Sequence, residues 1–271
     1  MVRIGTVWDR TTEVIGGRGN MLAGIAATGI FLPSIVQAAF RDFALPAAQL
    51  VGLLAAIVML WAQLAIVAAS SDPSTTGGSA QRIATARFLP AMGVVIIVVI
   101  VAAILSLPGI TLLIASGFDF AAAQAGRTQG AIDAGKAAGS GLYFFVFALF
   151  MLWLGARLIV LYPVIVNERL GLGAIARSFR LTRGLTWKVI GVLILYAIVF
   201  LVALMAATSI VGLVFRLILG SDSVALVTFL AGIAGAIVTT IFSVLQAVFT
   251  AQLYLAARGP DAAPVGAALP E

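Results

Sequence analysis

Cysteine and histidine are both absent from this 271-residue chain, and charged residues make up only 10% of it. Without cysteine there is no disulfide and no thiol nucleophile, and without histidine there is no imidazole for acid–base catalysis and no usual ligand for haem or zinc. We therefore expect no catalytic residue, no metal and no cofactor. Because 62% of the residues are hydrophobic, the remaining polar surface is too small to cover a soluble globule.

Apolar residues are concentrated in six stretches, each long enough to cross the hydrocarbon core of a bilayer. The stretches run over about residues 21–40, 47–69, 90–116, 142–166, 189–219 and 224–257. Residues 1–258 are predicted to form a single polytopic all-α membrane domain, followed by a disordered tail at 259–271. Pro33 is expected to kink the first span, Pro90 to lie in the first turn of the third, and Pro108 to kink that span or end it early.

The basic residues lie mainly in alternate connections between these spans. Eleven of the 16 Lys and Arg residues fall in the N-terminal segment, the loops after the second and fourth spans, and the tail, whereas four fall on the opposite side. This asymmetry predicts a multi-pass protein of the bacterial inner membrane with both termini in the cytoplasm and no cleavable signal peptide. The net charge of +6 is spread over several loops, so we expect anionic phospholipids, and no nucleic acid, as partners.

Residues 2–15 place apolar side chains on one face at helical spacing. They are predicted to form an amphipathic helix at the membrane surface, which the glycine-rich run 16–20 breaks. A weak repeat relates two later segments, because Arg82 followed by 92–96 matches Arg180 followed by 190–194 at the same spacing. The chain is interpreted as a threefold repeat of an interfacial segment and a transmembrane hairpin, with chance similarity between apolar sequences as the alternative.

The connection from Asn167 to Lys188 is predicted to contain a cytoplasmic interfacial helix between the fourth and fifth spans. Its apolar face is expected to comprise Leu172, Ile175 and Phe179, and an adjacent arc comprises Arg177, Arg180 and Arg183. Gly184 is expected to end the helix and Trp187 to begin the fifth span. The basic residues either bind anionic headgroups or serve only to orient the protein.

Arg157 is the one charged residue well inside an apolar stretch. A guanidinium placed there costs a few kcal/mol, so we expect it to have a role. Its expected partners are carbonyl groups at helix ends, the amides of Gln63, Gln246 or Gln252, or a lipid phosphate. Two roles are open: an interhelical hydrogen-bond clamp, or a contact with a lipid or a substrate.

Polar side chains also form a stripe along the sixth span. The members, spaced by four, three and four residues, are Thr239, Ser243, Gln246 and Thr250. Side chains at this spacing lie on one face of a helix. The stripe either packs within the helix bundle or lines a hydrated groove or lipid path.

The end of the fourth span resembles a group of bacterial integral membrane proteins. The residues that carry the resemblance are Arg157, the run YPVIVNE at 162–168, the run GAIARSFRLTRG at 173–184, and the pair Trp187 and Lys188. They are similar to the membrane domain of glycerophosphoryl diester phosphodiesterases. The resemblance implies a membrane module and does not imply phosphodiester hydrolysis, since we expect no catalytic barrel in a chain filled by apolar spans and lacking histidine.

These observations predict a non-enzymatic inner-membrane protein that acts as a lipid-interacting or scaffolding module. The residues expected to contact lipid or a membrane-protein partner are Arg157, Glu168, Arg177, Arg180, Arg183, Trp187 and Lys188. The alternative is a transporter or lipid-translocation facilitator whose path is lined by Arg157 and the polar stripe of the sixth span. An enzyme is the third class, and the sequence offers no spatially credible catalytic set for it.

Overall fold

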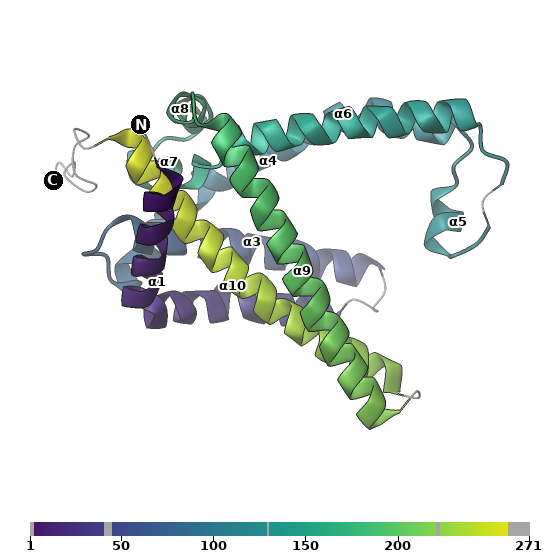
Figure 1. The fold of residues 1–271 in the computed structure, drawn as a ribbon, viewed down its shortest axis with the longest axis horizontal. Helices are drawn as coiled ribbons and strands as arrows, with labels where there is room; N and C mark the ends of the chain where they lie inside the picture. Colours follow the sequence, from purple (N-terminus) through teal and green to yellow (C-terminus); the bar gives the residue numbers. More distant parts are fainter. Residues whose placement is uncertain (1–2, 41–44, 129, 221–222, 260–271) are drawn as a thin grey trace.

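The structure is a computed structural model, and it describes residues 3–40, 45–128, 130–220 and 223–259. In chain order the helices are α1 (Ile4–Ala26), the π-helical turn η1 (Ala27–Phe31), α2 (Leu32–Ala39), α3 (Leu45–Ser71), α4 (Gly77–Ala115), α5 (Phe120–Gln124), α6 (Ala134–Leu158), α7 (Leu161–Glu168), α8 (Gly173–Leu181), α9 (Thr186–Leu219) and α10 (Val224–Arg258) (Figure 1). Apart from Gly259, the predicted disordered tail lies outside the described residues.

Six helical segments are long and apolar enough to cross a membrane, which confirms the all-α membrane class. They are Ile4–Ala39, Leu45–Ser71, Gly77–Ala115, Ala134–Glu168, Thr186–Leu219 and Val224–Arg258. Several are longer than the apolar stretches in the sequence, because polar residues at their ends continue the helix. The described part of the chain forms three antiparallel hairpins in succession, made by α2 with α3, α4 with α6, and α9 with α10.

The N-terminal amphipathic segment and the first span form one bent helix. The backbone of α1 leaves helical geometry at Arg18, where φ is −128° and ψ is 16°. Glycines surround this position in the sequence, and their low helix propensity makes a bend there inexpensive. Residues 4–17 therefore run across the end of the hairpins, and the remainder of α1 turns into the first span (Figure 1).

The kink expected at Pro33 takes the form of a widened turn. The π-helical residues Ala27–Phe31 come directly before α2, and Pro33 lies at the start of α2. Proline cannot donate to the carbonyl four residues earlier, and its ring crowds that carbonyl. A π-helical turn accommodates the ring without ending the helix, so the first span continues to Ala39.

Pro90 does not lie in the first turn of its helix, contrary to the prediction from the sequence. Helix α4 begins 13 residues earlier, at Gly77, where Thr76 and Ser79 form a reciprocal capping box. The same helix also continues past Pro108 to Ala115, so both prolines lie inside it. The segment around Arg82 is consequently continuous with its span, whereas the matching segment around Arg180 is the separate helix α8. The middle unit thus differs from the third in local structure.

The predicted fourth span is divided in two. Helix α6 starts at Ala134, capped by Asp133, and ends at Leu158, and Val160 has non-helical angles before α7 begins. Pro163 explains the break, because its ring would collide with the carbonyl of Ile159 in a continuous helix. At the start of α6, backbone N–H groups donate hydrogen bonds to the Asp133 carboxyl, and the bond from Lys136 has the largest effect. These bonds hold the pKa of Asp133 below its usual value.

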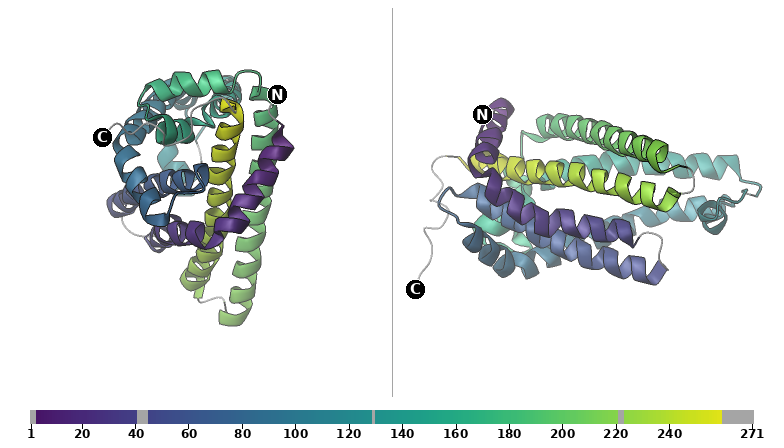
Figure 2. Two further views of the ribbon diagram at one scale, coloured as in Figure 1. Left: turned by 90° about the vertical axis from the view of Figure 1, so that its left-hand side faces the viewer. Right: turned by 90° about the horizontal axis from the view of Figure 1, so that it is seen from below.

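Close packing is concentrated at one end of the molecule, here called the packed end. It consists of residues 62–71 of α3, residues 247–254 of α10, and helix α7. Nearly every side chain is buried in the first two segments, and most are buried in α7. From there the three hairpins extend in different directions (Figure 1), and Figure 2 shows the same arrangement from two other sides. Most of α9 is exposed, with only Thr186 and Val189 buried. Exposed apolar helices of this kind are solvated by lipid chains.

Candidate functional site

The interfacial helix α8 packs on the end of α6 through small and hydroxyl side chains. Ala174, Ser178 and Thr182 are its buried residues, whereas Leu172 is 58% exposed and Phe179 only half-buried. Ile175 of the predicted apolar face also packs against the core as a half-buried side chain, so the face of α8 that packs on α6 lies about one position around the helix from the predicted apolar face. The Oγ atom of Ser178 and the Oγ1 atom of Thr182 donate to the carbonyl of Arg157, at 2.7 and 3.3 Å. That carbonyl is available because α6 ends there.

Arg157 joins α6 to α8 at the same point. Its Nη1 atom donates to the carbonyl of Phe179 at 3.2 Å, and its guanidinium lies 5.5 Å from the ring centroid of Trp153 and 5.7 Å from that of Phe179. A helix-end carbonyl is thus its polar partner, and two aromatic faces attract its charge. The Nε atom is buried and has no hydrogen-bond partner among the described residues. This geometry is that of an interhelical clamp.

Glu168, Arg177 and Tyr254 tie α7, α8 and α10 together. The Nε atom of Arg177 donates to both carboxylate oxygens of Glu168, at 3.0 and 2.8 Å. The hydroxyl of Tyr254, a fully buried side chain, donates to the same carboxylate at 3.1 Å. Glu168 and Arg177, both predicted to contact lipid or a partner, are half-buried and bound to each other. Their contacts fix the position of α8.

The other basic residues of this segment point outward. Arg180, Arg183 and Lys188 are exposed, and none of them has an acidic partner in the part of the chain that the structure describes. Trp187, beside Lys188 in the first turn of α9, is 83% exposed. The turn between α8 and α9 is made possible by Gly184, whose φ of +82° is unfavourable for a residue with a Cβ. This cluster is a charged surface with one large aromatic group.

The carbonyls at the carboxyl end of α3 are held by residues that sequence reasoning did not assign to this role. Arg18 donates to the carbonyls of Ala69, Asp72 and Pro73 from the bend in α1. Gln252 donates to the carbonyl of Ser70 at 2.8 Å. A helix end of this kind needs donors because its last carbonyls have no partner in the helix. Only the fold brings these donors to it, and the sequence carries no local signal for the contact.

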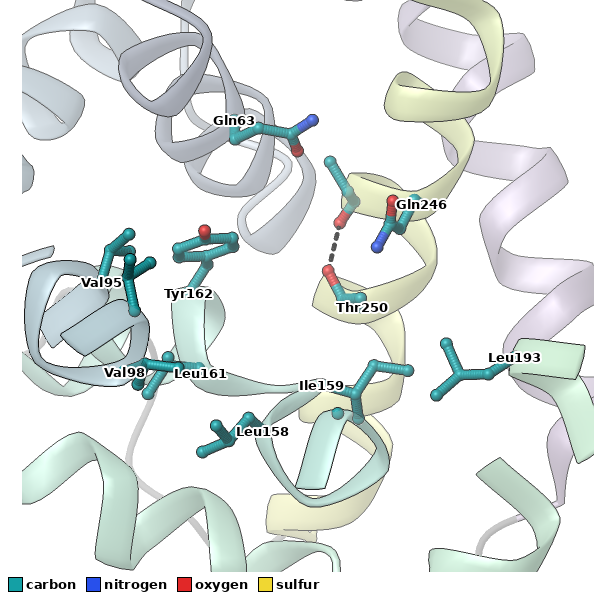
Figure 3. A pocket seen from close by; sticks show the side chains of 13 residues that line it. Gln63, Val95, Val98, Leu158, Ile159, Leu161, Tyr162, Leu193, Gln246 and Thr250 are labelled. Atoms are coloured by element: carbon teal, nitrogen blue, oxygen red, sulfur yellow. Dashed lines mark hydrogen bonds between the residues drawn. The ribbon is translucent and has the colours of Figure 1, made fainter. Parts of the chain in front are cut away.

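A cavity of about 490 Å³ lies between the hairpins, beside the packed end. Figure 3 shows the side chains of Gln63 from α3, Tyr162 from α7, and Gln246 and Thr250 from α10 around this space. The other lining residues are Val95, Val98, Val99, Gly155, Leu158, Ile159, Leu161, Leu193 and Ala247. Thr250 donates to the carbonyl of Ala247 in its own helix. The cavity is therefore apolar with a few neutral polar groups.

The predicted stripe of the sixth span divides at this cavity. Gln246 and Thr250 line the cavity, whereas Thr239 and Ser243, which come earlier in α10, do not. Arg157 is not a lining residue either, although Gly155 and Leu158 are. This cavity therefore does not join Arg157 to the whole stripe, as the path expected for a transporter would. Gln63 and Tyr162, which sequence reasoning had not grouped with the stripe, complete the polar set.

Comparisons of the chain with models of protein families, with characterised proteins and with solved structures give no match. The resemblance to the membrane domain of glycerophosphoryl diester phosphodiesterases therefore stays a prediction. Its residues have definite positions in the fold, because Arg157, Pro163, Glu168 and Arg177 build the junction of α6, α7 and α8.

Proposed function

We propose that this protein is a non-enzymatic, lipid-interacting module of the bacterial inner membrane, and that its basic surface binds anionic phospholipid headgroups at the cytoplasmic leaflet. The surface consists of Arg180, Arg183, Trp187 and Lys188. The observation that supports the proposal is a contrast between neighbouring cations: Arg177 is neutralised by Glu168, whereas Arg180, Arg183 and Lys188 are exposed and have no acidic partner among the described residues.

The position of this surface fits headgroups. It lies where α9, a candidate span, begins, and Trp187 is a side chain typical of the interface between hydrocarbon and water. Each exposed cation contributes about 1 kcal/mol of attraction to an anionic leaflet. The clamp through Arg157 and the ion pair through Arg177 hold α8 rigidly against the packed end, so the cations are presented at fixed positions.

The test is a titration of the purified full-length chain in detergent with phosphatidylglycerol, followed by native mass spectrometry of the bound lipid. The double variant Arg180→Gln/Arg183→Gln is expected to bind roughly thirtyfold more weakly, since it loses about 2 kcal/mol of attraction. The control, Arg127→Gln/Arg216→Gln, removes the same charge from exposed residues at the far end. Equal affinities in the two double variants would contradict the proposal, as would equal binding of phosphatidylcholine by the native chain.

A second candidate function is lipid translocation or transport, and the cavity between the hairpins favours it. Gln246 and Thr250 of the predicted stripe do line a space at membrane depth. In this form of the hypothesis the path uses Gln63 and Tyr162 in place of Arg157.

A further inference from the structure

The cavity between the hairpins is lined by polar groups that form no hydrogen bond with other described residues. The carboxamides of Gln63 and Gln246 and the hydroxyl of Tyr162 have no hydrogen-bond partner among the described residues, although they lie on helices that span the membrane. By contrast, Gln252, six residues after Gln246 on the same helix, is buried and donates to a backbone carbonyl. An amide left unpaired at such depth is costly, so the arrangement calls for a polar occupant.

The charge of the lining restricts what that occupant is. Every described residue around the cavity is neutral, and most of them are valine, leucine or isoleucine. An ionic headgroup would lose its hydration there without gaining a counter-ion. Carboxamides both donate and accept hydrogen bonds, which suits a ligand that carries ester carbonyls and a hydroxyl. The volume of about 490 Å³ is in the range of ligand pockets and is large enough for a polar core with the first part of two hydrocarbon chains.

The depth and the opening of the cavity agree with a lipid ligand. Gln63 and Thr250 each lie eight residues before the ends of their helices, at Ser71 and Arg258, or about 12 Å along the axis. This is below the level of the charged loops and within the spans. Val99, Gly155 and Gln246 are lining residues that are also exposed, so the cavity opens between the hairpins toward the bilayer.

We propose that this cavity binds a diacylglycerol, with its ester carbonyls and free hydroxyl bonded by Gln63, Gln246 and Tyr162 and its acyl chains leaving through the opening. The ligand is a neutral glycerolipid because the cavity has no group to neutralise a phosphate. The inference goes beyond the binding of anionic headgroups by α8, since an uncharged lipid offers nothing to Arg180 or Arg183. The two proposals therefore fail or succeed separately.

The test is photolabelling of the purified full-length chain in detergent with a diacylglycerol that carries a diazirine in one acyl chain. Gly155→Leu is the first variant, because Gly155 lines the cavity and an added Cβ there meets no atom within 4 Å. Its matched control is Gly93→Leu, an exposed glycine inside α4 with the same open surroundings but outside the cavity. Leucine favours a helix more than glycine does, so both variants should fold.

The second pair of variants tests the polar groups. Gln63→Leu/Gln246→Leu removes both carboxamides, and Gln49→Leu makes the same change at an exposed site on α3. Saturable labelling is expected to fall at least tenfold in Gly155→Leu and in the double variant, and to stay unchanged in the two controls. Labelling that is the same in all variants would overturn the proposal. It would also be overturned if a phosphatidylglycerol with the same diazirine competed as well as unlabelled diacylglycerol.

Discussion

At the scale of single residues, the polar side chains of this apolar chain act mainly on backbone carbonyls. Arg157 binds the carbonyl of Phe179, Gln252 binds that of Ser70, and Arg18 binds three carbonyls at and just beyond the carboxyl end of α3. These are the groups that helix ends leave without partners, and a membrane protein has little water at such positions. A few charged residues therefore serve mainly to close helix ends.

The first prediction concerns Arg18. Replacing it with Met removes the donor from three carbonyls, and we expect the free energy of unfolding in detergent to fall by about 2 kcal/mol. Arg18→Lys should restore only part of this, since one ammonium group is more compact than the guanidinium fork. The measurement is thermal unfolding of the purified protein. The control is Arg10→Met, since Arg10 is an exposed arginine in the same helix with no hydrogen bond or ion pair from its side chain among the described residues. Equal melting temperatures for Arg18→Met and Arg10→Met would exclude the role.

At the scale of helices, proline and glycine decide where the spans bend and where they meet. Pro33 follows a π-helical turn and Pro163 follows a break between two helices. Pro90 and Pro108, by contrast, lie inside the continuous helix α4. Glycines allow close approach where two helices of a hairpin touch. At Gly29, in the π-helical turn, an added Cβ would overlap the Cβ of Ala62.

The second prediction uses that contact. Gly29→Ala should lower the free energy of unfolding by about 1–3 kcal/mol, because Ala62 is fully buried and its Cβ cannot rotate away. The double variant Gly29→Ala/Ala62→Gly exchanges the two residues, leaves the summed helix propensity unchanged, and should recover most of the loss. Melting temperatures in detergent measure both effects. Gly24→Ala, with open surroundings on the same helix, should not destabilise the protein; a similar drop there would show that helix contact is not the cause.

At the scale of the whole molecule, the segments that connect the spans lie in two groups, one at the packed end and one at the opposite ends of the hairpins. The start of α1, the loop between α3 and α4, helix α8 and the end of α10 lie at the packed end, whereas α5 and the end of α9 lie at the ends of diverging hairpins (Figures 1 and 2). The basic loops are those of the packed end. We infer from the charge asymmetry that this end faces the cytoplasm.

The third prediction tests this orientation. The chain has no cysteine, so single cysteines give labelling without background. Gly171→Cys lies in the loop before α8 and Thr128→Cys lies after α5, and both positions are exposed. A membrane-impermeant maleimide added to spheroplasts should label Thr128→Cys at once and Gly171→Cys only after the membrane is permeabilised. The reverse order would place the packed end outside and contradict the positive-inside assignment.

Local chemistry made much of this fold predictable. The six spans follow from apolar runs of sufficient length, the bend near Arg18 from its glycine neighbours, and the end of α8 from Gly184. The prediction that Pro90 lies in the first turn of a helix is wrong, because the capping box formed by Thr76 and Ser79 starts α4 at Gly77. The break before Pro163 was missed because the apolar run is continuous in the sequence.

The sequence by itself determined that the chain has helices able to cross a membrane. The hydropathy of about 20 consecutive residues reflects the free energy of transferring that segment from water to hydrocarbon. Only the tertiary structure decided which faces pack. Ser178 and Thr182, and not Leu172, are buried in the interface of α8, and Gln63 joins Gln246 at one cavity from helices far apart in the chain. The physical reason is that lipid chains and a protein interior are equally apolar, so hydrophobicity cannot tell a packed face from a lipid-facing one. Close contact of small residues and the pairing of polar groups make that choice, and both depend on the partner helix.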